Sequence, residues 1–272
     1  MSEPHVLTSV EDGVMLVTLN RPEIMNAIGE EMFTLLIDAI DEANADDDIS
    51  ALVLTGAGDA FCAGAEISEN GRLAWVKPVP TRQELLDRHG VSTRVTLAFL
   101  DSDVPIIGAI NGVAAGGGFG FALCCDMRFM ADTASMGSIF IKRGLASDFG
   151  VAYWLPRLVG LGMAHELLYD GEPVSAERCL ELGIANRVVP REQLLDEALA
   201  YARKIADGPP LAYTSIRRML RRSTELPFIH YLEYEWTSQL GLFASRDSKE
   251  AFRAFAERRD PRFRGSDTAA RG

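Results

Sequence analysis

Three consecutive glycines, Gly116, Gly117 and Gly118, separate an apolar, strand-like segment from a segment of helical character that ends near Cys125. Glycine lets a ligand approach the backbone without a side-chain clash. A helix that begins at such a turn directs free N–H groups and the positive end of its dipole toward one place. These donors suit an oxyanion that develops on a substrate. Tight packing of the helix against the strand is the simpler alternative for the glycines alone.

A second turn with glycines follows the apolar segment 51–54. It reads Thr55-Gly56-Ala57-Gly58, and the segment FCAGAEI follows at residues 61–67. Two strand ends therefore offer backbone amides. A nucleotide site is a weaker interpretation, because no third glycine completes G-x-G-x-x-G and no segment matches G-x-x-x-x-G-K-[ST].

The order of these segments resembles the crotonase family, also called the enoyl-CoA hydratase/isomerase family, over nearly the whole chain. The resemblance rests on several short motifs in their order: Asn20-Arg21-Pro22 with Asn26-Ala27, FCAGAEI, the run NGVAAGGG with Cys125-Asp126, Leu155-Pro156-Arg157-Leu158 with Gly160, and ANRVV at residues 185–189. It implies an α/β fold built as a spiral of β-β-α turns. It also implies an acyl-CoA substrate whose thioester oxygen lies between two backbone amides, with no cofactor besides the coenzyme A of the substrate.

By motif position, the resemblance implies that the two catalytic amides are those of Ala65 and Gly117. The same resemblance places a further set of residues around the substrate: Met25, Ala63, Ala65, Glu66, Ile67, Ser68, Gly117 and Phe140. Glu66 has an alternative role as the partner of a nearby cation. Residues 71–83, which contain two prolines and no regular period, are expected to form a loop. The resemblance implies that this loop covers the ligand.

The chain departs from the family's hydratase pattern at both acid/base positions. Hydratases carry one glutamate where this chain has Gly120 and a second where it has Phe140. Addition of water to an enoyl double bond needs a group that activates water and a proton donor for the α-carbon, so the loss of both glutamates argues against the standard mechanism. Asp148 is the remaining candidate, because it is the only carboxylate in the glycine-turn segments that the resemblance places near C2 and C4 of the acyl group. Several members of the family have their catalytic carboxylate at the position equivalent to Asp148. They include some enoyl-CoA isomerases and an aromatic acyl-CoA dehalogenase.

One carboxylate is sufficient for a 1,3-proton shift in an enoyl thioester, so the sequence favours an isomerase with Asp148 as its acid and base. Two alternatives stay open, namely a hydratase with atypical residues and a non-catalytic member that binds acyl-CoA. Asp148 has an alternative role too, because Asp is favoured as the cap of a following helix.

Composition and charge exclude other classes of function. The 272 residues are 47% hydrophobic and 24% charged, and the formal net charge is −12. This net charge argues against nonspecific binding to nucleic acid or to an anionic membrane, since both need a basic face. The phosphates of coenzyme A would need local cations, and the candidates are Arg21, Lys142, Arg143, Arg258, Arg259, Arg262 and Arg264.

The cysteines and the N-terminal residues indicate a cytoplasmic protein without a metal. Cys62, Cys124, Cys125 and Cys179 show no paired spacing of metal ligands and no disulfide framework. The first residues have acids and no apolar core of a secretory signal. Residues 104–125 carry no charge, but six glycines, a proline and an asparagine favour a buried strand, a turn and a helix over a membrane span.

Short strands and helices alternate along most of the chain, which is typical of an α/β fold. We expect strands at 14–19, 51–54, 106–110 and 128–131, and helices at 30–45 and 84–100. The pattern becomes helical after Gly208-Pro209-Pro210, with helices at 211–222, 228–243 and 249–258. We therefore divide the chain into an acyl-CoA-binding core, residues 1–207, and a helical oligomerisation region, residues 208–272. The resemblance implies a homotrimer or a hexamer made of two trimers.

Overall fold

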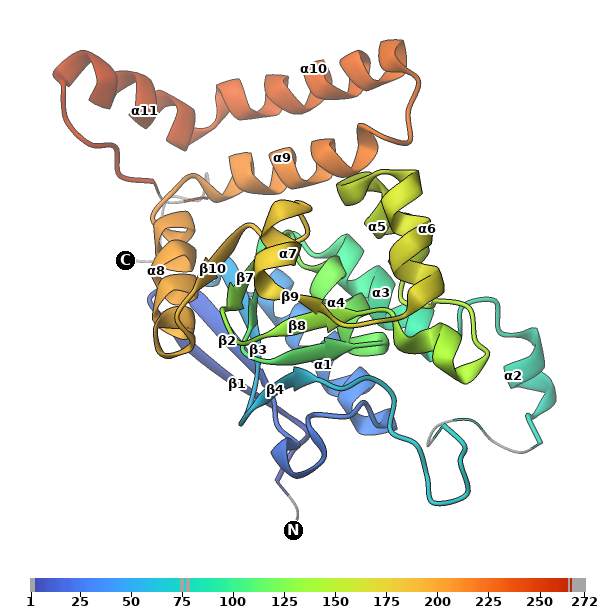
Figure 1. Cartoon of the computed structure of the whole chain (residues 1–272). Coiled ribbons are helices and arrows are strands. Elements are labelled where there is room, and N and C mark those ends of the chain that lie inside the picture. Colours follow the sequence, from blue (N-terminus) through green and yellow to red (C-terminus); the bar gives the residue numbers. More distant parts are fainter. Residues whose placement is uncertain (1–2, 74–75, 77–78, 264, 266–272) are drawn as a thin grey trace.

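The computed structural model describes residues 3–73, 76, 79–263 and 265. Within them, a six-stranded sheet has the order β1-β2-β3-β5-β7-β10, and a four-stranded sheet has the order β4-β6-β8-β9 (Figure 1). The strands are β1 (Val6–Glu11), β2 (Val14–Leu19), β3 (Ala51–Gly56), β4 (Ala60–Cys62), β5 (Ile106–Ile110), β6 (Val113–Ala115), β7 (Met127–Ala131), β8 (Ser135–Gly137), β9 (Val174–Ser175) and β10 (Arg187–Val189).

Helices surround the two sheets. The α-helices are α1 (Glu30–Ala45), α2 (Arg82–Leu86), α3 (Gly90–Asp101), α4 (Gly117–Cys124), α5 (Val151–Val159), α6 (Leu161–Asp170), α7 (Ala176–Glu181), α8 (Leu194–Ala206), α9 (Pro210–Arg222), α10 (Phe228–Ala244) and α11 (Arg246–Glu257). Short 3-10 helices are η1 (Pro22–Ile24), η2 (Ile139–Arg143) and η3 (Arg191–Gln193).

The chain winds as a spiral between the sheets. In the larger sheet β1 pairs antiparallel with β2, and every other neighbouring pair is parallel. In the smaller sheet β4, β6 and β8 are parallel. The successive pairs β3/β4, β5/β6 and β7/β8 each give one strand to each sheet, and helices follow them. This topology confirms the expected α/β fold of β-β-α turns.

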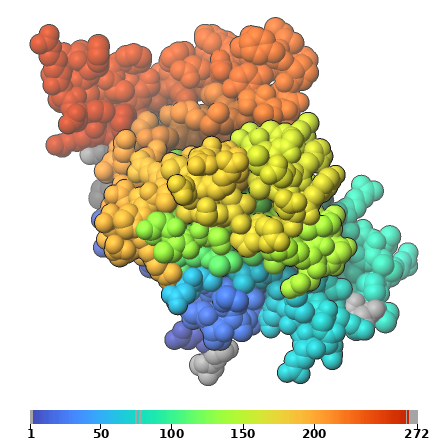
Figure 2. All heavy atoms as spheres, viewed as in Figure 1, coloured from blue at the N-terminus to red at the C-terminus, as the bar shows by residue number. Residues whose placement is uncertain are grey.

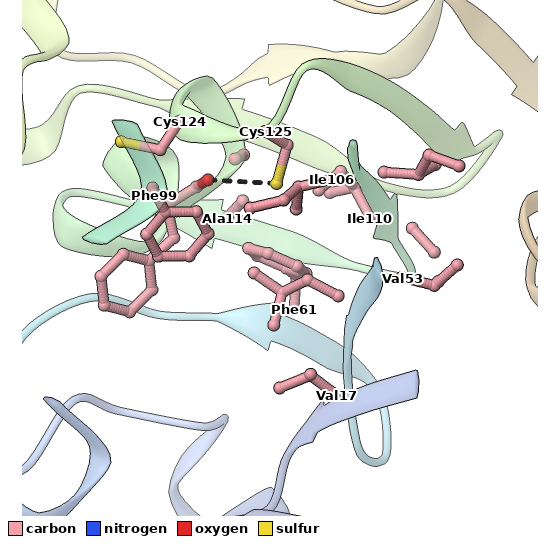
Figure 3. Close-up of a cluster of buried hydrophobic side chains, with 14 of the residues drawn as sticks. Val17, Val53, Phe61, Phe99, Ile106, Ile110, Ala114, Cys124 and Cys125 are labelled. Carbon is pink, nitrogen blue, oxygen red and sulfur yellow. Dashed lines mark hydrogen bonds between the residues drawn. The ribbon is translucent and has the colours of Figure 1, made fainter. Parts of the chain in front are cut away.

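The core is formed by the larger sheet together with α1, α3, α4 and α8. Every residue of β3, β5 and α4 is buried. Figure 3 shows Phe61 of β4 and Ile106 of β5 in this core, and the Cys125 thiol donates to the Phe121 carbonyl at 3.4 Å. Strands buried on both faces read as continuous apolar runs, which is why β3 and β5 were visible in the sequence.

Most elements expected from the sequence are present at nearly the expected bounds, and one helix is not. The helix expected at 84–100 is divided into α2 and α3. Gly90 has φ +58, and the Asp87 carboxylate accepts a hydrogen bond from the His89 amide, so the chain turns between the two helices. The short strands β4, β6 and β8 were not expected, because three residues are too few to show a period of two.

The three C-terminal helices were expected, and they form a separate layer beside the sheets (Figures 1 and 2). Helix α9 is fastened to the core by the buried side chain of Arg217, which donates to Asp126 Oδ2 at 2.7 Å and to the Phe99 carbonyl at 2.6 Å. Helix α10 contains no buried residue. The division of the chain at residue 207 stays a prediction.

The cysteines are thiols buried in the fold. Burial raises the pKa of Cys62, Cys124 and Cys179 to about 12, so these groups are protonated and unreactive at neutral pH. Among the described residues, no cluster of three or more His, Cys, Asp or Glu side chains could hold a metal ion. In the same part of the chain, every helix is too short or too polar to cross a membrane.

Candidate active site

The Ala65 amide is left without a partner by the backbone pairing around it. The Ile28 amide donates to the Gly64 carbonyl at 2.8 Å, and the Glu66 amide donates to the Ile28 carbonyl at 3.0 Å. This parallel bridge uses the residues on either side of Ala65 and bypasses its own N–H. Within the described ranges the Ala65 N–H has no hydrogen-bond acceptor, so it is available to a ligand.

The Gly117 amide is available for a different reason. Gly117 is the first residue of α4, and the first amides of a helix have no intrahelical acceptor. The Gly116 amide donates to the Gly137 carbonyl at 3.0 Å, but Gly117 has no such acceptor in the described part of the chain. The positive end of the α4 dipole adds to the attraction for an anion.

The two free amides come from turns that touch. Gly64 has φ +94, and a Cβ atom at this residue would lie 2.6 Å from the Ala115 carbonyl oxygen and 3.4 Å from the Gly117 nitrogen. A side chain at residue 64 would therefore separate the turn that carries Ala65 from the turn that carries Gly117. Paired N–H donors in this arrangement can bind a thioester oxygen and stabilise negative charge on it.

Polar side chains hold the Ala65 segment from behind. Asn26 is fully buried with φ 55, and its amide nitrogen donates to the carbonyls of Ala57 and Ala60 at 2.9 and 2.8 Å. The Arg21 guanidinium bridges the Ala27 carbonyl at 3.0 Å and the Glu66 carboxylate at 2.5 Å. Sequence patterns suggested no role for Asn26 beyond the motif, and they suggested Arg21 only as a candidate contact for the phosphates of coenzyme A.

The Arg21 contact assigns Glu66 to the alternative role, as the partner of a nearby cation. Its direct contact with a substrate stays a prediction.

Asp148 lies in the turn between η2 and α5. The residue is exposed, yet partial desolvation of its carboxyl raises the pKa to about 6, and a hydrogen bond with its own backbone offsets part of this effect. A carboxyl with such a pKa can accept and return protons near neutral pH. The N-cap of α5 is Gly150, without a side-chain cap, and Asp148 contributes only its backbone carbonyl to the Val151 amide at 3.1 Å. Helix capping by the Asp148 side chain is thus absent from the described structure.

Phe149 fills the space beside Gly120. A Cβ atom at Gly120 would lie 2.4 Å from the Phe149 Cβ, and the Phe149 side chain is 4% exposed. The position where hydratases of the family carry a glutamate therefore has no room for any side chain in this fold.

An apolar cavity of about 430 Å³ lies next to the Asp148 turn. No charged residue lines it, and its volume is within the range of small-ligand sites. Phe140 connects it to the oxyanion turn, since a Cβ at Gly116 would lie 3.9 Å from the Phe140 Cε1. The lining residues are Ser138, Phe140, Ile141, Gly144, Leu145, Ala146, Ser147, Leu168 and Tyr169.

The other substrate-binding residues expected from the sequence lie close to the Ala65 turn. Met25 is 56% exposed, and its carbonyl accepts a hydrogen bond from the Ala63 amide at 2.9 Å. Ile67 is 47% exposed, and the Ser68 hydroxyl donates to the Arg72 carbonyl at 3.0 Å. Within the expected loop over the ligand, residues 74, 75, 77 and 78 lie outside the described residues. Contacts of all these residues with a substrate stay predictions.

Several cations expected to contact the phosphates of coenzyme A have partners within the chain. Arg21 pairs with Glu66, Lys142 with Glu172 at 2.7 Å, and Arg259 with Glu250 at 2.5 Å. Hydrogen bonds from the Arg259 and Arg253 side chains hold the pKa of Glu250 well below its usual range. Arg264 lies outside the described residues. Phosphate contacts of the remaining cations stay predictions.

A family model described as enoyl-CoA hydratase/isomerase matches residues 9–266. The chain belongs to this family. The fold agrees, since the crystal structure of a putative enoyl-CoA hydratase from Streptomyces coelicolor A3(2) superposes with a TM-score of 0.90 at 33% identity, over 96% of this chain and 94% of that chain. The resemblance seen in the sequence motifs is confirmed, and the chain belongs to a family of enzymes that act on acyl-CoA.

Relatives with both kinds of activity in their names are similar to the chain. The (E)-benzylidenesuccinyl-CoA hydratase of Thauera aromatica is 34% identical over 96% of this chain and 99% of that protein. The 1,2-epoxyphenylacetyl-CoA isomerase of Escherichia coli (strain K12) is 35% identical over 96% of this chain and 98% of that protein. Hydratase names are common among the relatives, so the family alone gives no preference for isomerisation.

Proposed function

We propose that this enzyme isomerises the double bond of an enoyl-CoA, with Asp148 as the single acid and base. The thioester oxygen binds between the N–H groups of Ala65 and Gly117. The Asp148 carboxylate removes a proton from C2 or C4, and the electron pair moves through the conjugated system to the thioester oxygen. The two amides stabilise the resulting dienolate. Asp148 then returns the proton to the other carbon, and the double bond is shifted.

One observation carries this proposal: neither glutamate of the hydratases is present at its position in this chain, and Asp148 is a carboxylate basic enough to replace them. Phe149 takes the space at Gly120, and Phe140 stands at the second position. Asp148, with its pKa raised to about 6, is a usable base near neutral pH. A proton shift needs one such group, and hydration needs activation of water as well.

Hydration by atypical residues is the second candidate, because hydratase names are common among relatives of similar identity. In such an enzyme Asp148 would activate water instead of returning a proton. Acyl-CoA binding without catalysis is the third candidate, and it gives no role to a basic carboxylate beside the thioester.

Assays of the purified protein with 3-enoyl-CoA and with 2-enoyl-CoA distinguish the three candidates. An isomerase converts each substrate into the other without forming 3-hydroxyacyl-CoA. A hydratase forms 3-hydroxyacyl-CoA from 2-enoyl-CoA and leaves 3-enoyl-CoA unchanged. A binding protein shifts its melting temperature with acyl-CoA and converts neither substrate. Either of the last two results would contradict the proposal.

A further inference from the structure

Phe149 has a backbone conformation that costs energy for a bulky residue. Its φ is +50, in the left-handed region that residues other than Gly, Asn and Asp seldom adopt, and Gly150 follows with φ +72. Conformations of this kind persist only where the surrounding structure fixes them, and they occur often at functional sites. The strained residue here directly follows the candidate base, Asp148.

The contacts of the Phe149 ring lead to the oxyanion turn. A Cβ at Gly117 would lie 2.8 Å from the Phe149 Cε2, so the ring borders the residue that supplies one oxyanion amide. The ring also stacks on Phe33 at a centroid distance of 6.0 Å and meets Phe121 edge-on at 5.2 Å. Phe149 is therefore fixed between α4 and the aromatic side chains of the core.

The left-handed turn places neighbouring side chains in opposite environments. Asp148 is exposed, whereas Phe149 is 4% exposed. The tight contact of the Phe149 Cβ with Gly120 fixes the backbone that carries the carboxylate. The ring also borders Gly117, whose amide is expected to bind the thioester oxygen. Phe149 therefore links the segment that carries the carboxylate to the oxyanion turn.

We propose that Phe149 is the positioning residue of this active site: packed in the space left open at Gly120, it fixes the Asp148 carboxylate relative to the Gly117 amide. This inference rests on the proposed function and names the device on which that function depends. The absence of a side chain at Gly120 then has a structural role. It makes room for the ring that holds the aspartate.

The first test compares Phe149→Leu with the matched control Phe99→Leu. Phe99 is 1% exposed in the same aromatic core, and it stacks on Phe121. Both variants leave a void of similar size and should lower the melting temperature. Only Phe149→Leu is expected to reduce kcat, by about 10- to 100-fold with KM nearly unchanged, because a small misplacement of a catalytic group is costly. Equal kcat losses in the two variants would overturn the proposal.

The second test displaces Phe149 without changing it. In Gly120→Ala the added methyl collides with the Phe149 Cβ, and the expected result is a similar loss of kcat. The control is Gly162→Ala in α6, where nothing lies within 4 Å of the added Cβ and the activity should stay at the wild-type value. Wild-type kcat in Gly120→Ala would overturn the proposal.

A double-mutant comparison separates this inference from the proposed function. If Phe149 acts through Asp148, then Phe149→Leu should cause less than about a twofold further loss of kcat when Asp148→Asn is already present. A full additional loss in that background would show that Phe149 acts by another route. If Asp148→Asn alone keeps the wild-type rate, the proposed function itself fails.

Discussion

At the scale of residues, the site combines one partly desolvated carboxylate with two unpaired amides. Asp148 has a raised pKa because its surroundings are less polar than water, and a hydrogen bond with its own backbone offsets only part of this effect. The Ala65 amide is unpaired because the bridge with Ile28 uses the residues on either side of it. The Gly117 amide is unpaired because Gly117 is the first residue of α4. The free amides thus follow from local backbone geometry. Together with the Asp148 carboxylate they provide a base and two hydrogen-bond donors for an oxyanion.

The pKa of Asp148 gives the reaction a defined dependence on pH. The carboxylate acts as a base only when ionised, so kcat/KM for isomerisation should rise with pH through about 6 and stay level above it. An aspartate with an ordinary pKa of about 4 would give a level profile from about pH 5 upward. A pH-rate profile between pH 4.5 and 8.5 measures the difference, and a level profile from pH 5 would contradict the assignment.

The same shift has a consequence for folding. Because the fold raises the pKa of Asp148, the native state binds a proton more tightly than the unfolded chain. This contribution favours folding at low pH and is lost as pH rises from about 4 through about 6. Ionised Asp148 is thus a cost to stability that its function requires.

Asp148, Gly120 and Phe140 could be identified from the sequence, because the neighbouring motifs show which family positions these residues occupy. The sequence did not identify Phe149, whose importance depends on a contact with Gly120, 29 residues earlier in the chain. Positive φ at a phenylalanine has no signal in the sequence either. Contacts between distant turns and strained backbone conformations are set by packing and therefore require the structure.

At the scale of elements, the active site depends on the approach of two turns. The turn after β4 carries Ala65, and the turn after β6 carries Gly117. Parallel pairing of β4 with β6 places both strand ends at the same edge of the smaller sheet. The apolar runs of β3 and β5 were readable from the sequence, whereas the three-residue strands that align the amides were not.

Gly64→Ala tests the approach of these turns. The added methyl would lie 2.6 Å from the Ala115 carbonyl, so the two turns must separate and the oxyanion site must widen. We expect kcat to fall by about 10²- to 10³-fold, the usual effect of removing one oxyanion donor.

Gly183→Ala is the matched control for this variant. Gly183 also has a positive φ, +75, but no atom lies closer than 3.9 Å to the added Cβ. It should share the backbone strain of Gly64→Ala and keep the wild-type kcat. Equal rates for the two variants would show that the contact between the turns has no part in catalysis.

At the scale of the whole molecule, the C-terminal helices leave a large apolar area uncovered. Side chains of α10 and α11 that are apolar and exposed include Phe228 at 75%, Ile229 at 62%, Trp236 at 59%, Phe252 at 68% and Phe255 at 84%. Apolar area of this kind on one layer of a protein is typical of an interface between subunits. The helical pattern of this region was clear in the sequence, but its exposure became visible only in the structure.

We expect a homotrimer, or a hexamer of two trimers, held together by the C-terminal helices. Light scattering at micromolar concentration should give three or six times the mass of the chain. Ile229→Glu places a charge on the exposed face of α10 and should shift the mass toward the monomer, since burial of an unpaired charge is costly. A stable monomer in the wild-type protein would contradict the expectation.

The role of Asp148 as the proton carrier is tested by its exchange for asparagine. Asparagine keeps the size of the side chain and removes the base. We expect kcat for the conversion of 3-enoyl-CoA to fall by about 10²- to 10⁴-fold, the usual contribution of general acid and base catalysis. The affinity for acyl-CoA should stay unchanged, and the melting temperature should not fall, because a desolvated charge is removed. A variant that binds acyl-CoA and keeps the wild-type kcat would contradict the assignment of Asp148 as the proton carrier.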